Sequence, residues 1–202
     1  MEKKKKKPSL ILKGIHYFHI FLLAKKYVRK YYDKEILKSK WFASPHKSLG
    51  AQGWNWVVVD TKANKKLKKI GTAKWPHNPS TTIINGDNIF FDYNDLNIFQ
   101  SPGCYFQAIG RITIGSGTWI GPNVGIITSN HDIYNLEKHS MPQNVIVGEK
   151  CWIGMNSVIL PGVVLGDHTI VGAGSVVTKS FPDGNCLVAG SPAKIVKFYE
   201  KN

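Results

Sequence analysis

From residue 112 onward, one apolar position recurs at every sixth residue. It is aliphatic in nine of nine cases, and glycine follows it in six of them. Neither the helical period of 3.6 nor the strand period of two produces this pattern. The pattern predicts a coil of short straight segments and regular corners, with the aliphatic side chains stacked inside. These positions are Ile114, Ile120, Ile126, Val147, Ile153, Ile159, Leu165, Val171 and Val177.

Two further positions of each repeat carry information. The glycine after the aliphatic residue marks a corner where a side chain would clash or where φ must be unusual. The fourth residue after the aliphatic position is small or β-branched in seven repeats. Those residues are Thr118, Val124, Cys151, Ser157, Val163, Thr169 and Ser175.

The repeat loses its phase once. Ile126 and Val147 are 21 residues apart, which is three hexads plus three residues. The phase shift predicts that residues 129–144 leave the coil as a loop. Loops that leave a rigid repeat scaffold often carry function. This one contains Asn130, His131, Asp132 and His139.

A helix is predicted near the N-terminus. Ile11, Ile15, Phe18 and Leu22 have the spacing of one helical face, and a basic segment follows at residues 25–30. The apolar stretch is too short to span a bilayer, and no signal-cleavage site precedes Lys25. Two interpretations stay open: an interfacial helix on an anionic membrane, or a helix that packs on its own chain or a neighbouring subunit. Residues 41–80 are predicted to be irregular, with one strand at residues 56–60 and a basic turn at residues 62–69.

The net charge of +14 is unevenly distributed. Residues 1–74 carry 20 basic and four acidic side chains (+16), whereas the other 128 residues carry seven basic and nine acidic ones (−2). Because the repeats are nearly neutral and no nucleic-acid motif accompanies the basic segment, we expect no nucleic-acid partner. Three cysteines without metal-binding spacing predict neither a disulfide scaffold nor a zinc site. They favour a cytoplasmic protein, with the inner face of the membrane as a further expectation.

The repeat region resembles a known family. The segments are ITIGSGTWIGPNVGIITSNHD, then VIVGEKCWIG, GAGSVVTK and GSPAK, in that order. Together they resemble the hexapeptide-repeat acyltransferases, most closely the O-acetyltransferases of sugars and of bacterial capsular and surface polysaccharides. The resemblance covers residues 105–198, and weakly residues 83–104.

The resemblance implies an all-β fold for the repeats. The expected structure is a left-handed parallel β-helix, triangular in section, with a protruding catalytic loop and a basic, partly helical N-terminal extension. The expected division is an extension at residues 1–80 and an acetyltransferase domain at residues 81–202. A homotrimer is also implied, with acetyl-CoA in grooves between neighbouring subunits and a carbohydrate acceptor.

The same resemblance assigns roles to residues. His131 matches the catalytic histidine, and histidine is the side chain whose ordinary pKa lies nearest neutrality. Trp152 resembles a tryptophan near that histidine, and the backbone N–H of Met155 matches an oxyanion donor. Acetyl-CoA contacts carry over to Ala173, Thr178, Lys179, Lys194 and Lys197, the lysines pairing with phosphates. Asn130, Asp132 and His139 are candidate substrate contacts, although Asp132 is more typical of a turn and His139 is also an alternative base.

Three other functions are alternatives for this fold. An N-acetyltransferase acting on an amino sugar or a nucleotide-linked amino sugar would use the same histidine and coenzyme. Zinc hydratases of this fold need another spacing, because His131 and His139 are eight residues apart and His168 is distant, so no metal is expected. A non-catalytic scaffold would not retain the histidine and the coenzyme motif. The sequence thus favours an acetyl-CoA-dependent O-acetyltransferase acting on a sugar hydroxyl of a surface glycan or its precursor.

Overall fold

The repeats form three sheets of parallel strands. The computed structural model describes residues 10–42, 51–67 and 73–200. Sheet 1 contains β1 (Thr82–Ile83), β3 (Tyr105–Phe106), β6 (Gly125–Ile126), β9 (Val158–Ile159) and β12 (Val176–Val177). Sheet 2 contains β2 (Ile89–Phe90), β4 (Ile112–Ile114), β7 (Val145–Val147) and β10 (Val164–Leu165). Sheet 3 contains β5 (Trp119–Ile120), β8 (Trp152–Ile153), β11 (Ile170–Val171), β13 (Cys186–Gly190) and β14 (Ala193–Phe198), the last pair antiparallel.

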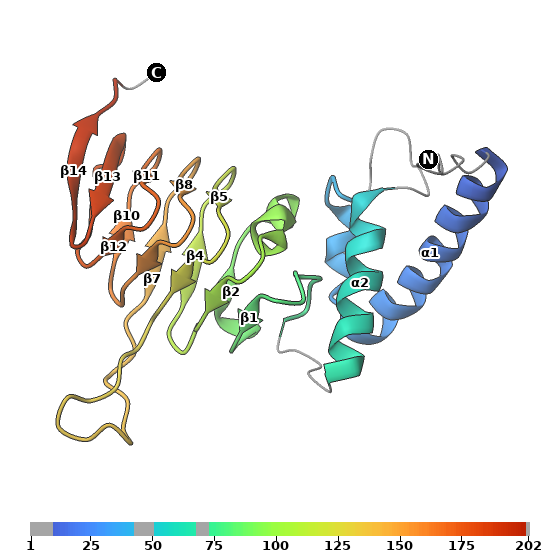
Figure 1. Cartoon of the computed structure of the whole chain (residues 1–202), viewed down its shortest axis with the longest axis horizontal. Helices are drawn as coiled ribbons and strands as arrows, with labels where there is room; N and C mark the ends of the chain where they lie inside the picture. Colours follow the sequence, from blue (N-terminus) through green and yellow to red (C-terminus); the bar gives the residue numbers. More distant parts are fainter. Residues whose placement is uncertain (1–9, 43–50, 68–72, 201–202) are drawn as a thin grey trace, which may run out of the picture.

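Three successive strands complete one turn of a coil. β7, β8 and β9 lie in sheets 2, 3 and 1, and β10, β11 and β12 repeat that order. Val158 pairs with Val176 and Trp152 pairs with Ile170, so neighbouring turns are offset by 18 residues, or three hexads. Stacked turns form the elongated body in Figure 1. The arrangement fits the left-handed parallel β-helix that the resemblance implies.

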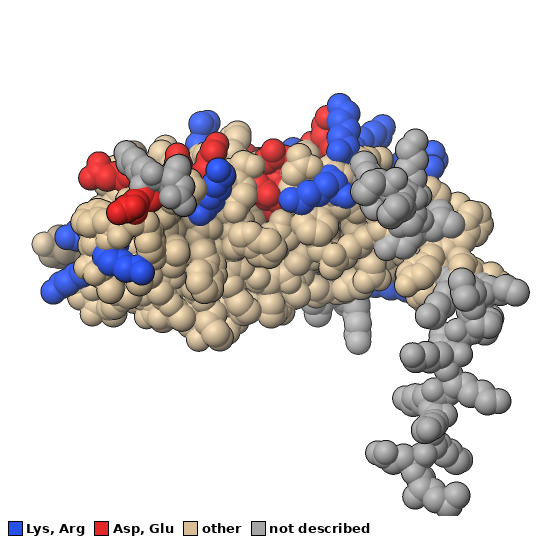
Figure 2. Space-filling model, turned by 90° about the horizontal axis from the view of Figure 1, so that it is seen from above, with Lys and Arg blue, Asp and Glu red and all other residues tan. Residues whose placement is uncertain are grey.

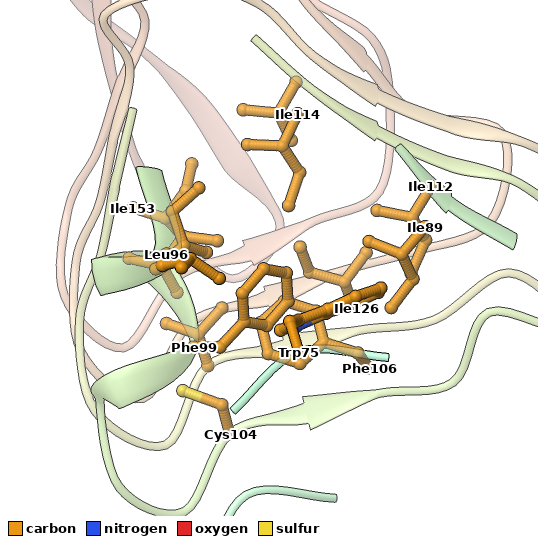
Figure 3. Close-up of a cluster of buried hydrophobic side chains, with 14 of the residues drawn as sticks. Trp75, Ile89, Leu96, Phe99, Cys104, Phe106, Ile112, Ile114, Ile126 and Ile153 are labelled. Atoms are coloured by element: carbon orange, nitrogen blue, oxygen red, sulfur yellow. The ribbon is translucent and has the colours of Figure 1, made fainter. Parts of the chain in front are cut away.

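The predicted inward positions form the core. All nine repeating aliphatic residues are at most 4% exposed. The seven small or β-branched residues are at most 1% exposed, so each segment buries two side chains. At the N-terminal end of the coil, Trp75, Phe99 and Phe106 continue this stack with aromatic rings (Figure 3). The prediction of a stacked aliphatic interior is confirmed.

The corners use two positions for different reasons. A Cβ atom on Gly154 would lie 2.6 Å from the Ala173 nitrogen on the next turn, so glycine there permits close approach of two backbones. The left-handed φ angles fall instead on the third residue after the aliphatic position. Residues with positive φ at that position are Gly117, Asn123, Lys150, Asn156, Gly162, His168 and Gly174. Of the two explanations for the repeating glycine, the clash is the one that applies.

The region before the repeats contains two long helices, so the described chain is partly helical rather than all-β. They are α1 (Leu10–Tyr31) and α2 (Gln52–Leu67), which pack against each other. The strand predicted at residues 56–60 is wrong, because these residues lie in α2. Three consecutive valines favour a strand locally, but helical spacing buries Trp54, Val57, Val58 and Thr61 on one face. Of the predicted basic turn, residues 62–67 are also helical, and residues 68 and 69 lie outside the described part.

The apolar stripe predicted on α1 is not the face that packs. Ile15, Phe18 and Leu22 are 61%, 50% and 52% exposed. On the opposite face of α1, Ala24, Val28 and their neighbours are buried, and this helix packs against α2. The stripe therefore does not pack on its own chain within the described residues. Neither helix is long and apolar enough to cross a membrane, judged over the part of the chain that the structure describes.

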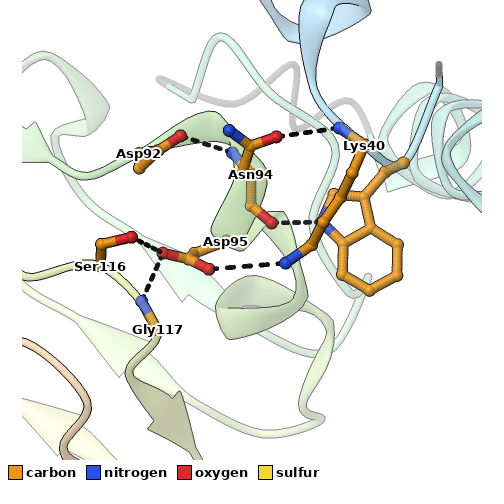
Figure 4. Close-up of polar contacts among 7 residues, drawn as sticks. Lys40, Asp92, Asn94, Asp95, Ser116 and Gly117 are labelled. Carbon is orange, nitrogen blue, oxygen red and sulfur yellow. Dashed lines mark hydrogen bonds and ion pairs between the residues drawn. The ribbon is translucent and has the colours of Figure 1, made fainter.

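Polar contacts join this region to the coil (Figure 4). Three short helices lie at the junction: η1 (Lys34–Lys38), η2 (Gly86–Asn88) and η3 (Tyr93–Gln100). The Lys40 amide donates to Asn94 Oδ1 at 2.9 Å, and Trp41 Nε1 donates to the Asn94 carbonyl at 2.7 Å. The buried Asp95 carboxylate accepts from Gly117 N at 2.8 Å and lies 3.9 Å from Lys40 Nζ. The predicted domain boundary between residues 80 and 81 stays a prediction.

Matched alanine substitutions distinguish the helix from the predicted strand. Val57 is fully buried and Val59 is 46% exposed. We expect Val57→Ala to lower the free energy of unfolding by about 2 kcal/mol, from two lost methyl groups and the cavity they leave. Val59→Ala should change it by less than about 0.5 kcal/mol. Residues two apart share a face in a strand, so equal losses in urea unfolding would contradict the helix.

Candidate functional site

The predicted loop leaves the coil between β6 and β7 (Figure 1). Its two ends are held together by an isolated antiparallel bridge between His131 and His139. The Ser140 amide donates to the Asn130 carbonyl at 2.8 Å, and Ser129 Oγ donates to the Ser140 carbonyl at 2.9 Å. The prediction of a loop at this point is confirmed, and hydrogen bonds close the loop where it joins the coil.

His131 lies where the loop joins the coil, and its side chain is exposed. Its Nδ1 lies 2.7 Å from the Leu136 carbonyl oxygen. Because a carbonyl can only accept, this contact assigns the proton of the neutral ring to Nδ1 and leaves the Nε2 lone pair free. A neutral imidazole oriented in this way can act as a general base.

His139 lies directly beside His131. The ring centroids are 4.5 Å apart and the ring planes are inclined by 33°. The second ring covers one side of the first and limits its rotation. The structure therefore brings together the predicted base and the predicted alternative base.

Asp132 acts locally as a turn residue. Its Oδ1 accepts from the amides of Tyr134 and Asn135 at 2.8 and 2.9 Å. This is the geometry of a side chain that closes a turn at the start of the loop. Its contacts match the turn interpretation rather than a free substrate contact.

Trp152 lies on a different side of the coil from His131. It points outward from β8 in sheet 3 and is 56% exposed, whereas the loop leaves at the corner between sheets 1 and 2. Trp119, 62% exposed, is its in-register partner on the preceding turn. Sequence reasoning missed Trp119, although both tryptophans immediately precede an inward isoleucine. One chain does not bring Trp152 and His131 together.

Met155 and Ala173 occupy the corner between sheets 3 and 1. They lie on adjacent turns, where Gly174 N donates to the Met155 carbonyl at 2.8 Å. A Cβ on Gly121 would lie 2.8 Å from the Met155 nitrogen, so glycine at position 121 permits the close approach of these two backbones. The Met155 N–H has no acceptor among the residues that the structure describes. It is a suitable donor for a developing negative charge.

The predicted coenzyme lysines lie at the C-terminal end of the coil. Thr178 and Lys179 follow β12 at the corner between sheets 1 and 2, the corner from which the loop leaves. Lys179 lines a pocket of about 200 Å³ together with Phe181, Ile195 and Phe198. Ile195 and Phe198 belong to β14, the strand that also carries Lys194 and Lys197. The pocket thus connects Lys179 with the strand of the other two lysines.

Neither a reactive thiol nor a cluster of metal-binding side chains is found within the described residues. The three cysteines are free and buried, and burial raises the pKa of the Cys151 thiol to about 11. A thiol in this environment is almost wholly protonated at neutral pH and is a poor nucleophile. The described part of the chain holds no group of three potential metal-binding side chains.

Comparisons with known proteins agree with this fold. Residues 144–179 match the bacterial transferase hexapeptide (six repeats). The chain is 38% identical over 138 residues to galactoside O-acetyltransferase of Escherichia coli K12, covering 63% of this chain and 62% of that protein. It is 36% identical over 118 residues to a putative lipopolysaccharide biosynthesis O-acetyl transferase of the same organism, covering 51% and 58%. The chain spans about three fifths of the length of these relatives.

Solved structures show the same fold. A hexapeptide-repeat acetyltransferase from Vibrio cholerae complexed with acetyl coenzyme A has a TM-score of 0.57 at 21% identity, covering 84% of this chain and all of that one. Galactoside acetyltransferase in complex with coenzyme A has a TM-score of 0.56 at 21% identity, covering 91% and 82%. The chain therefore carries a bacterial transferase hexapeptide repeat, and its resemblance to the hexapeptide-repeat acyltransferases is confirmed.

The turn at Asp132 gives a test of the loop. Asp132→Ala removes the acceptor of two amides, and we expect the turn to lose about 1 kcal/mol. Amide hydrogen exchange at Tyr134 and Asn135 should then accelerate about fivefold, measured by nuclear magnetic resonance. Glu137→Ala, at an exposed acidic residue of the same loop, is the control. Equal exchange in both variants would show that Asp132 does not hold the turn.

Proposed function

We propose that the protein transfers the acetyl group of acetyl-CoA to a sugar hydroxyl of a surface glycan or its precursor. One observation carries this proposal: the exposed His131 lies where the loop is closed, with Nδ1 at 2.7 Å from the Leu136 carbonyl and with no partner of Nε2 among the described residues. The similarity to enzymes named galactoside O-acetyltransferase and lipopolysaccharide O-acetyl transferase supports the acceptor class. The similarity to folds solved with coenzyme A supports the donor.

The reaction needs one base and one oxyanion donor. His131 Nε2 takes the proton of the sugar hydroxyl. At the same time the hydroxyl oxygen attacks the thioester carbonyl carbon and forms the C–O bond. The tetrahedral oxyanion is stabilised by backbone N–H groups, for which Met155 is the candidate. Collapse breaks the C–S bond, and the imidazolium returns its proton to the coenzyme A sulfur. The products are an O-acetyl sugar and free coenzyme A.

The coenzyme would lie along the C-terminal turns. Lys179, Lys194 and Lys197 are exposed cations, suited to its pyrophosphate and 3′-phosphate. Ala173 and Thr178 present small side chains at the corners that border sheet 1. We assign Asn130 and His139 to the acceptor side of the base. A cytoplasmic location follows from the use of acetyl-CoA and fits three buried free thiols.

The site is proposed to be shared between subunits of a homotrimer. Within one chain, His131 lies at one corner of the coil, whereas Trp152 and Met155 lie on sheet 3 and at the corner beyond it. The loop exposes four apolar side chains that a neighbouring chain could cover. They are Ile133 (81% exposed), Tyr134 (92%), Leu136 (72%) and Met141 (84%). A neighbour that covers this loop would bring its own sheet 3 to His131.

The acceptor is tested by following release of the coenzyme A thiol from acetyl-CoA across a panel of sugars and glycans. Alkaline treatment of the product then separates the two acyltransferase classes. An ester on oxygen is hydrolysed and an amide on nitrogen survives. An alkali-stable product would replace the O-acetyltransferase by an N-acetyltransferase.

The base is tested by His131→Ala. A positioned base contributes about 10² to 10⁴ in rate, so kcat should fall by that factor. Binding of acetyl-CoA should stay near normal, because its proposed contacts lie on other turns. His168→Ala is the control, because His168 is an exposed histidine at another corner of the same coil and has no role in the proposed reaction.

Two further variants make this test specific. Lys179→Ala should weaken acetyl-CoA binding with a smaller effect on kcat. His139→Ala should fall between wild type and His131→Ala, and His139→Phe should recover part of the loss if the second ring acts by stacking. Near-wild-type turnover of His131→Ala would show that another base is used.

The trimer is tested by mass and by complementation. Light scattering should give three times the 22.6 kDa mass of the chain. When His131→Ala and Trp152→Ala chains are refolded together, about a quarter of the shared sites receive an intact residue from both subunits. Activity should return to that level. Mixed trimers without any recovery would place both residues in the site of a single chain.

A further inference from the structure

The outer face of α1 is apolar in its first part and basic in its last. α1 is the outermost helix of the molecule, with its packed face on α2 (Figure 1). Residues that follow steps of three or four lie in one row along a helix. On α1 such a row runs through Ile15, Phe18, Leu22, Lys26 and Arg29, all of them exposed. The face therefore changes from apolar to cationic within a few turns.

The cations of this face are not neutralised by the protein. Lys25, Lys26, Arg29 and Lys30 are exposed, and none forms an ion pair with a carboxylate among the described residues. Lys25 Nζ lies 4.9 Å from the centre of the Phe21 ring, and Lys30 Nζ lies 5.3 Å from the centre of the Tyr31 ring. Figure 2 shows basic side chains on the helical part of the molecule, seen from above. Four exposed cations in two helical turns form a surface that is complementary to an anionic partner.

A second copy of the chain is a poor partner for this face. A twofold contact would bring together two faces that both carry these four cations and would supply no carboxylate from either α1 face to neutralise them. An anionic bilayer satisfies both halves at once, because the headgroups take the cations and the acyl boundary takes Ile15, Phe18 and Leu22. α1 has 22 residues but is not apolar enough to cross a membrane.

We propose that the outer face of α1 binds the surface of anionic membranes, with its apolar half at the acyl boundary. The proposal stands on the exposure and charge of this face and does not depend on acetyl transfer. Its readout, vesicle binding by the full chain, requires no turnover. Failure of the vesicle test therefore leaves the proposed enzyme activity untouched, and the reverse also holds.

The charge of the face is tested with vesicles of phosphatidylcholine, alone or mixed with phosphatidylglycerol. The full chain should sediment with the anionic vesicles and not with the neutral ones. Each cation near an anionic surface contributes about fivefold, so Lys26→Gln with Arg29→Gln should lower partitioning about 25-fold. The control is Arg111→Gln with Lys150→Gln, which removes the same charges from exposed positions on the coil. Equal losses in both double variants would overturn the proposal.

The apolar half needs its own test, because any polyanion could attract the cations. Phe18→Ser should lower partitioning at least about tenfold by removing an aromatic ring from the acyl boundary. Val59→Ser is the control, since Val59 is 46% exposed and Phe18 50%. Unchanged binding of Phe18→Ser would mean a polyanion contact without a lipid boundary. Light scattering of the α1 variants completes the test, and an altered mass would make this face an interface between copies.

Discussion

The stacking of equivalent residues on neighbouring turns is the constraint on which the rest of the structure depends. A two-residue strand is too short to be stable alone, but an interior strand such as β9 pairs in register with the turns on both sides, through β6 and β12. Inward aliphatic side chains then meet their equivalents on the next turn, 18 residues away where no loop intervenes, and backbones approach so closely that Gly154 cannot carry a Cβ atom. Stability in such a stack is the sum of contacts between neighbouring turns, so the sides of the coil remain free for other functions.

The site follows from the single interruption of this register. The coil continues correctly before and after residues 129–144, so the inserted chain must enter and leave at one corner. Backbone pairing of His131 with His139 closes the insertion at its base. A loop closed in this way transmits the rigidity of the coil to the imidazole ring, although its distal residues are exposed. Rigid support of a base is what catalysis by orientation requires.

The repeats could be predicted because each residue's environment depends only on its place in the hexad. For the same reason, the predictions of the inward positions and of the loop were both correct. The sheet on which each site residue lies could not be predicted in this way. A period gives the distance between residues along the chain, but it does not say which of the three sheets a residue belongs to. The left-handed φ at Asn123 and Asn156 was also missed, since asparagine adopts this conformation without a glycine to mark it.

The helical region is held by another kind of interaction, and this explains the errors there. Tyr32 donates a hydrogen bond of 2.6 Å to the buried Asp60 and lies 2.9 Å from Thr61, partners 28 and 29 residues away. His77 Nδ1 lies 3.6 Å from the same carboxylate. Burial and the nearby carboxylate raise the pKa of Tyr32, so the phenol stays a donor. Such networks are specified by geometry in three dimensions and leave no period in the sequence. Local β propensity at residues 57–59 therefore gave the wrong element, and the face of α1 that packs is decided by partners that only the folded chain brings together.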